Sequence, residues 1–188
     1  INLFDAIRVA ASPDAAGKGA LVVLNNEIQA ARDVVKTSTA RVETFKSGEL
    51  GFLGYADADG KVVFLRASAR THTAATEFDV DQITALQRVD IAYAYSGVDG
   101  VAVKALADAG CAGIVSAGLG SGSAPRAFLD ALSQARERGI CIVMASQAGN
   151  GRVMAKRAFV ERGFAVADNL APKKVRVLLM LALATTRD

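Results

Sequence analysis

A cluster of hydroxyl and charged side chains around Lys36 is the densest group of chemically useful residues in the sequence. Thr37, Ser38 and Thr39 follow Lys36 directly, and Asp33 precedes it by three positions. A buried lysine can act as a general base, because desolvation disfavours its charged form. The same composition suits a solvated loop equally well, since lysine is rarely buried. Both interpretations of Lys36 stay open on these residues alone.

Histidine and cysteine offer little further chemistry. His72 is the only histidine, and no Gly-x-Ser-x-Gly motif is present to hold a serine opposite it. It lies in a polar segment, so we interpret it as a surface or anchoring residue. Cys111 and Cys141 lie in apolar segments, which predicts small buried side chains rather than a disulfide framework. One histidine and two cysteines do not make an ordinary zinc site, and we expect no metal and no cofactor.

Three loops rich in glycine and serine follow predicted strands, at 96–100, 118–123 and 146–151. Ligands of open parallel sheets bind beyond the carboxyl ends of the strands, which is where these loops lie. The backbone amides of 118–123 could face an anion at the start of the next helix. The glycine spacing matches neither GxGxxG nor a Walker motif, and glycine is common in tight turns. A nucleotide-binding module is therefore only the third alternative.

Composition excludes several classes of protein. With 52% hydrophobic and 22% charged residues among 188, and a mean hydropathy of +0.28, the chain is not intrinsically disordered. Its longest apolar run, at 177–184, falls far short of the roughly 20 residues that span a bilayer. The net charge of +3 is scattered and no tryptophan is present, which argues against nucleic-acid binding.

The first 66 residues are predicted to hold a helix, a strand and a hairpin. Asn2 precedes an amphipathic turn and is interpreted as a helix N-cap, and Pro13 ends that helix. The expected elements are a helix over 3–11, a strand over 20–24, a helix-compatible stretch over 27–35 that gives way to β-branched residues, and a hairpin over 52–65. Because the chain begins at this helix cap and without Met, we expect a cut or processed piece of something longer.

Strands and helices alternate in the last hundred residues. The expected strands are 90–95, 112–117, 140–145 and 164–167, and the expected helices are 101–109, 125–138 and 172–186. Crossovers of this length require a parallel α/β sheet. The last helix is apolar on nearly every face, which predicts that it is well covered. We predict the end of a larger α/β domain (1–66), a linker (67–88) and a small doubly wound, flavodoxin-like parallel-sheet domain (89–188).

Short motifs in order along the chain match one family. They are Leu-Val-Val-Leu-Asn at 21–25, Arg-Asp-Val at 32–34, Lys-Thr at 36–37, Thr-Phe-Lys-Ser at 44–47, His-Thr at 72–73, Phe-Asp-Val at 78–80, Gly-Ile-Val-Ser-Ala-Gly at 113–118 and the apolar tail at 172–183. With these motifs, the sequence resembles the bacterial type II L-asparaginases over essentially its whole length.

The resemblance implies an amidohydrolase that converts L-asparagine, and often L-glutamine, to the acid and ammonia. In that family a threonine is the nucleophile and an Asp–Lys pair serves a second threonine; Lys36 matches that lysine. The nucleophile belongs to an N-terminal segment that these 188 residues do not contain. The resemblance also implies L-asparagine and L-aspartate as ligands, a homotetramer of intimate dimers and a periplasmic location.

Several positions depart from the family at its substrate site. Gly97 stands where the family has an amide or hydroxyl side chain that reaches into the neighbouring subunit's pocket. The family also has an acidic residue between the positions of Gly151 and Gly163, where this loop is shorter and Glu161 is the only acid available. Further replacements are Val35 for threonine, Ser38, Ser121 and Ser123 for asparagine, and Met144 and Gln147 for arginine. Two hypotheses follow: an active amidohydrolase, or a non-catalytic homologue that binds an amino acid or nothing.

Overall fold

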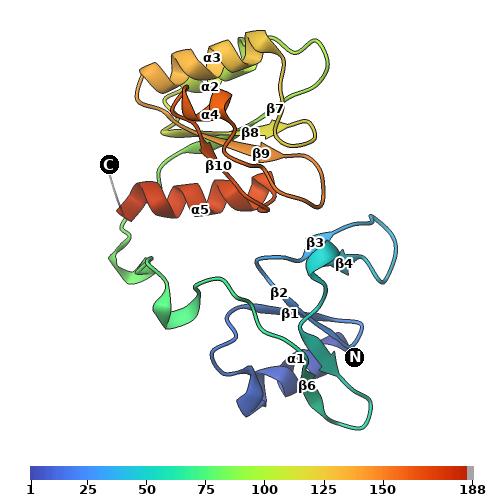
Figure 1. Cartoon of the computed structure of the whole chain (residues 1–188). Helices are drawn as coiled ribbons and strands as arrows, with labels where there is room; N and C mark the ends of the chain where they lie inside the picture. Colours follow the sequence, from blue (N-terminus) through green and yellow to red (C-terminus); the bar gives the residue numbers. More distant parts are fainter. Residues whose placement is uncertain (186–188) are drawn as a thin grey trace. The chain divides into compact units, whose positions relative to one another are not determined.

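Residues 1–185 are described by a computed structural model, in which they form two units (Figure 1). The first unit is Ile1–Glu77, and the second begins at Phe78. Each unit is described by itself. Among residues 1–185, no helix combines the length and the apolar character that a bilayer crossing needs.

A four-stranded antiparallel sheet is the centre of the first unit. Its strands, in the order β1-β2-β5-β6, are β1 Leu21–Leu24, β2 Glu27–Ala30, β5 Gly54–Ala56 and β6 Val62–Phe64. Helix α1 (Asn2–Ala11) packs on this sheet through a small core of Val9, Ile28 and Ala56. A separate two-stranded ribbon consists of β3 Val35–Lys36 and β4 Phe45–Lys46, and short 3₁₀ turns lie at Pro13–Ala15, Gly48–Leu50 and Thr73–Ala75. The predicted helix, first strand and hairpin are confirmed.

The prediction of a helix-compatible stretch over 27–35 is wrong, because Glu27–Ala30 form strand β2 and a turn follows at 31–33. Asn25 and Asn26 have φ angles of 49° and 63°, the left-handed pair that a tight two-residue hairpin needs. The chain therefore turns back, and Glu27 pairs with Leu24 across β1 and β2. The N-cap assignment of Asn2 is also wrong: Ile1 is the cap, and Asn2 Oδ1 accepts a hydrogen bond from Asn25 N at 3.0 Å.

A parallel sheet forms the second unit, as predicted. Its order is β10-β9-β8-β7, with β7 Val89–Tyr93, β8 Gly113–Gly118, β9 Cys141–Ser146 and β10 Ala165–Val166. Helices α2 (Val101–Asp108) and α3 (Arg126–Glu137) cover one face, and α5 (Pro172–Thr185) covers the other (Figure 1). A 3₁₀ turn at Val80–Gln82 and the four-residue helix α4 (Arg157–Val160) complete the unit.

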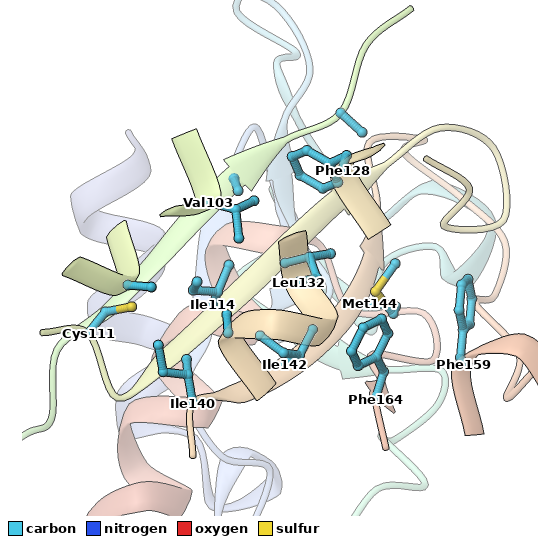
Figure 2. Packing of buried hydrophobic residues seen from close by; sticks show 14 of the residues in the cluster. Val103, Cys111, Ile114, Phe128, Leu132, Ile140, Ile142, Met144, Phe159 and Phe164 are labelled. Carbon is cyan, nitrogen blue, oxygen red and sulfur yellow. The ribbon is translucent and has the colours of Figure 1, made fainter. Parts of the chain in front are cut away.

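The larger core lies between the sheet and α2–α3. Figure 2 shows Phe128 and Leu132 of α3 facing Ile114, Ile142 and Met144 of the central strands. Strand residues alternate between the two faces, so the neighbours of these side chains along β8 and β9 face α5 instead. Both faces of the sheet are thereby covered, which explains why its strands are almost continuously apolar.

Within the second unit helix α5 is covered on one side only, so the expectation that it is well covered is wrong. Val175 and Leu179 are buried against the sheet. Val177 and Leu178 are 54% and 44% exposed, because a helix can place only one stripe of side chains against a flat sheet. Residue 186, the predicted end of this helix, lies outside the described residues.

Candidate active site

Lys36 lies at the end of β3, on the ribbon that β3 forms with β4. It is paired in register with Phe45, and Val35 is paired with Lys46. Its side chain is exposed, and it forms no ion pair within residues 1–185. Asp33, the acid near it in sequence, pairs with Arg32 at 2.9 Å. The first unit alone therefore leaves the amine of Lys36 accessible.

The hydroxyl groups of Thr37, Ser38 and Thr44 form hydrogen bonds to the backbone of the segment after Lys36. Thr44 is 7% exposed, and its Oγ1 accepts a hydrogen bond from Ser38 N at 2.9 Å and donates one to Ser38 O. Thr44 O accepts from Thr37 N at 2.7 Å and from Thr37 Oγ1 at 2.9 Å. Ser38 Oγ in turn accepts from Arg41 N at 3.3 Å. Two members of the cluster that the sequence singled out, Thr37 and Ser38, thus belong to a network with Thr44 that orders this segment.

A second polar network, which the sequence analysis missed, connects β4 with β2. Ser47 Oγ donates to Gln29 Oε1 at 2.5 Å, and Gln29 Nε2 donates to Glu27 Oε2 at 2.8 Å. Lys46 Nζ donates to both oxygens of Glu27 at 3.1 Å. Gln29 is 1% exposed and every polar atom of its side chain is paired. Recognising 27–30 as a strand would have placed residues 27 and 29 on one face and pointed to this network.

Gly97, in the second unit, follows β7 in the turn that leads to α2. Its φ of 78° is one that glycine adopts without strain. A Cβ built on Gly97 meets no atom within 4 Å. Asp99 Oδ1 accepts from Val101 N at 3.0 Å and so orders the start of α2. The turn therefore has room for a side chain at position 97, and its role toward substrate stays a prediction.

The 118–123 loop is closed on itself at the end of β8. A Cβ on Gly118 would lie 2.5 Å from Gly122 C, so only glycine fits there. Ser121 and Ser123 are exposed, and Lys156 brings its Nζ to 2.6 Å from Ser121 Oγ and 3.5 Å from Ser123 Oγ. The sequence gives no sign of this contact, since Lys156 lies more than thirty residues further along the chain.

Met144 and Gln147, two further positions at which this sequence departs from the family's substrate site, have structural roles in the second unit. Met144 is fully buried in the core between the sheet and α3. Its side chain therefore does not line a substrate site in this unit, and its inclusion among the substrate-site positions is wrong. Gln147 Nε2 donates to Ala94 O at 2.6 Å and to Ala117 O at 2.7 Å. It thereby ties together the carboxyl ends of β7 and β8.

Glu161 follows α4 on the surface of the second unit. Its carboxylate pairs with Arg157 Nε at 2.6 Å, and its side chain is 59% exposed. The backbone O of Gly163, two residues after Glu161, accepts a hydrogen bond from Arg136 Nε at 3.2 Å. Arg136 lies near the end of α3, the helix that precedes β9. No hydrogen bond or ion pair between described residues joins Glu161 to Gly97 or to the 118–123 loop. Its predicted role in binding substrate remains a prediction.

The cysteines behave as buried side chains. Both are free thiols; Cys111 is buried and Cys141 is half-buried. Burial raises the pKa of each thiol, so neither is a poised nucleophile near neutral pH. In the part of the chain that the structure describes, no three His, Cys, Asp or Glu side chains come together as a metal site.

Comparison with known proteins gives matches along the whole chain. The family model described as "Glutaminase/Asparaginase C-terminal domain" matches residues 88–188, and that described as "Asparaginase, N-terminal" matches residues 1–70. The chain is 41% identical to "L-asparaginase 2" of Bacillus subtilis (strain 168), with 100% of this chain and 49% of that protein covered. It is 41% identical to "Glutaminase-asparaginase" of Pseudomonas fluorescens biotype A and 42% identical to "Probable L-asparaginase periplasmic" of Haemophilus influenzae, again over 100% of this chain but 52% and 54% of those proteins. The chain thus spans about half the length of the curated relatives it matches.

Proposed function

The chain belongs to the glutaminase/asparaginase family, and from this membership we propose that the full-length protein carrying it is an amidohydrolase. Its substrate is L-asparagine, with L-glutamine as the second amide to test, and its products are the acid and ammonia. One observation carries the proposal: relatives named L-asparaginase and glutaminase-asparaginase are similar to this chain over its entire length.

Lys36 is the residue of this chain that we assign to the chemistry. It lies in the Lys-Thr motif on which the resemblance rests, at the end of a ribbon that presents its amine to solvent in the first unit. A hydroxyl nucleophile is weak until a base accepts its proton, and a lysine can supply that base. The nucleophilic threonine belongs to an N-terminal segment outside these residues, so that segment is the first partner the site needs.

Gly97 is assigned to the substrate pocket of a neighbouring subunit, and Glu161 is assigned to substrate binding. Gly97 lies in an open turn at the carboxyl end of a parallel strand, the edge at which ligands of such sheets bind. This assignment requires at least a dimer, and we propose a homotetramer built from intimate dimers. A relative named as periplasmic supports a periplasmic location.

The domain division that goes with this function is also a proposal. Residues 1–66 would complete a larger catalytic domain, 67–88 would link, and 89–188 would form the small C-terminal domain.

Ammonia release by the full-length protein tests the function. Turnover of L-asparagine, lost by about 100-fold or more in Lys36→Met, is the expected result for removal of a general base. Lys104→Met, on α2 of the second unit, is the matched control and should retain activity. If the wild-type protein releases no ammonia from either amide, the chain belongs to a non-catalytic homologue instead.

A further inference from the structure

We propose that Thr44 is the positioning residue for Lys36, and that Gln29 anchors β4, the strand that directly follows Thr44. The proposal rests on the proposed function, because it takes Lys36 to be the lysine that moves a proton. It gives Thr44 and Gln29, described above only as members of hydrogen-bond networks, a role toward the catalytic lysine.

The two-stranded ribbon that carries Lys36 is too short to be stable by itself. It has only two residue pairs, Val35 with Lys46 and Lys36 with Phe45, and even a full two-stranded hairpin is marginal in water. The exposed Lys36 side chain makes no ion pair within the described residues that could fix it. Its position must therefore come from contacts of the neighbouring backbone.

Thr44 supplies those contacts on the side that follows Lys36. Its hydroxyl accepts from Ser38 N at 2.9 Å and donates to Ser38 O, while its carbonyl accepts from Thr37 N at 2.7 Å and Thr37 Oγ1 at 2.9 Å. These are the two residues directly after Lys36. Thr44 also directly precedes Phe45, the register partner of Lys36. The 7%-exposed Thr44 side chain thus fixes Ser38, two residues after Lys36, and its backbone carbonyl fixes Thr37.

Gln29, on β2 of the four-stranded sheet, holds β4, the strand that contains Phe45. Ser47 Oγ donates to Gln29 at 2.5 Å, Gln29 donates to Glu27 at 2.8 Å, and Lys46 Nζ donates to Glu27 at 3.1 Å. Residues 46 and 47 are adjacent on one chain, and residues 27 and 29 lie on one face of β2. The network is therefore a closed clamp between β4 and the four-stranded sheet.

This arrangement predicts a kinetic signature that differs from simple destabilisation. Thr44→Val keeps the branched shape but removes the hydroxyl, so Ser38 N and O lose their partner and the segment after Lys36 loosens. A misplaced general base raises the barrier of proton transfer, whereas ground-state binding of the substrate is made by other residues. The loss should therefore appear in kcat and not in KM.

The experiment uses the full-length protein and measures ammonia release from L-asparagine. Thr44→Val should lower kcat about tenfold with KM changed by less than about twofold, and Thr44→Ser, which keeps the hydroxyl, should restore most of the activity. Thr73→Val is the matched control, because Thr73 Oγ1 also donates to a backbone carbonyl, His72 O at 2.6 Å, outside this network. Gln29→Met, which breaks the clamp from the other side, should reproduce the kcat loss, and it provides the test if Thr44→Val does not fold.

A double-mutant cycle with Lys36→Met decides between positioning and structure. Residues that act through one another are non-additive, so Thr44→Val or Gln29→Met should change the residual turnover of Lys36→Met by less than about twofold. An equal kcat loss in both backgrounds would overturn the proposal and leave Lys36 as the catalytic lysine. Undiminished turnover in Lys36→Met itself would overturn the assignment of Lys36, and with it the proposal. Ammonia release from neither amide by the wild-type protein would refute the proposed function as a whole.

Discussion

Placing an asparagine at Gly97 should tighten the binding of L-asparagine by the full-length protein. The turn has φ of 78° and no atom within 4 Å of a built Cβ, so the new side chain meets no steric barrier. The backbone strain is modest, since asparagine tolerates left-handed φ better than most residues. The amide would supply the contact that the resemblance expects at this position.

The magnitude follows from one hydrogen bond. A bond to a charged group contributes about 1.5–3 kcal/mol, and a water that bridges the gap beside glycine already recovers part of it. A net gain of about 1 kcal/mol corresponds to a KM about fivefold lower. Because the contact forms in the ground state and the transition state alike, kcat should hardly change.

Gly97→Ala is the matched control, because it carries the left-handed strain of a Cβ without the amide. Steady-state ammonia release gives KM and kcat for both variants, and their melting temperatures measure the strain. We expect the asparagine variant to melt at or above the temperature of the alanine variant, and a lower KM for the asparagine variant only. Equal KM values for the two variants at equal stability would refute the assignment of this turn to a substrate pocket.

Three further predictions concern activity, stability and thiol reactivity. Residues 1–188 produced alone should release no ammonia above background, because the proposed nucleophile lies outside them; turnover on the order of one per second would contradict this. Phe128→Ala should reduce the free energy of unfolding by about 3–5 kcal/mol in denaturant titrations, since Phe128 is 0% exposed in the larger core; a loss below about 1 kcal/mol would mean that the core collapses around the gap. Cys111 and Cys141 should react with iodoacetamide more slowly than a free cysteine at pH 8 and faster as pH rises, because burial raises both pKa values and lowers the thiolate fraction at a given pH; rates equal to those of the unfolded protein would show that the thiols are not buried.

The second unit could be predicted almost element by element from local sequence. Its strands are short apolar runs, α2 and α3 are amphipathic, and glycine or proline stands at the boundaries. The position of Gly97 in a turn after a strand follows from that alternation alone. These sequence signals are local, so they do not depend on how distant parts of the chain pack.

The segment 27–30 shows a case in which local sequence signals do not determine the secondary structure. Its residues are compatible with either a helix or a strand, and the decision came from the left-handed pair Asn25–Asn26 and from hydrogen bonding to β1. The exposed stripe of α5 is likewise not determined by local sequence, since an apolar helix is buried only where another element covers it.

The surroundings of Lys36 were decided by tertiary structure alone. The sequence identified the lysine and its hydroxyl neighbours, but not that Thr44 would bond the two residues after it. Nor did it indicate that Gln29 would reach Ser47, eighteen residues away. Such contacts depend on the register between strands, and a shift of one residue would turn each side chain to the opposite face. Residue type and spacing therefore determine which groups are available for chemistry, and only the paired backbones determine which of them meet.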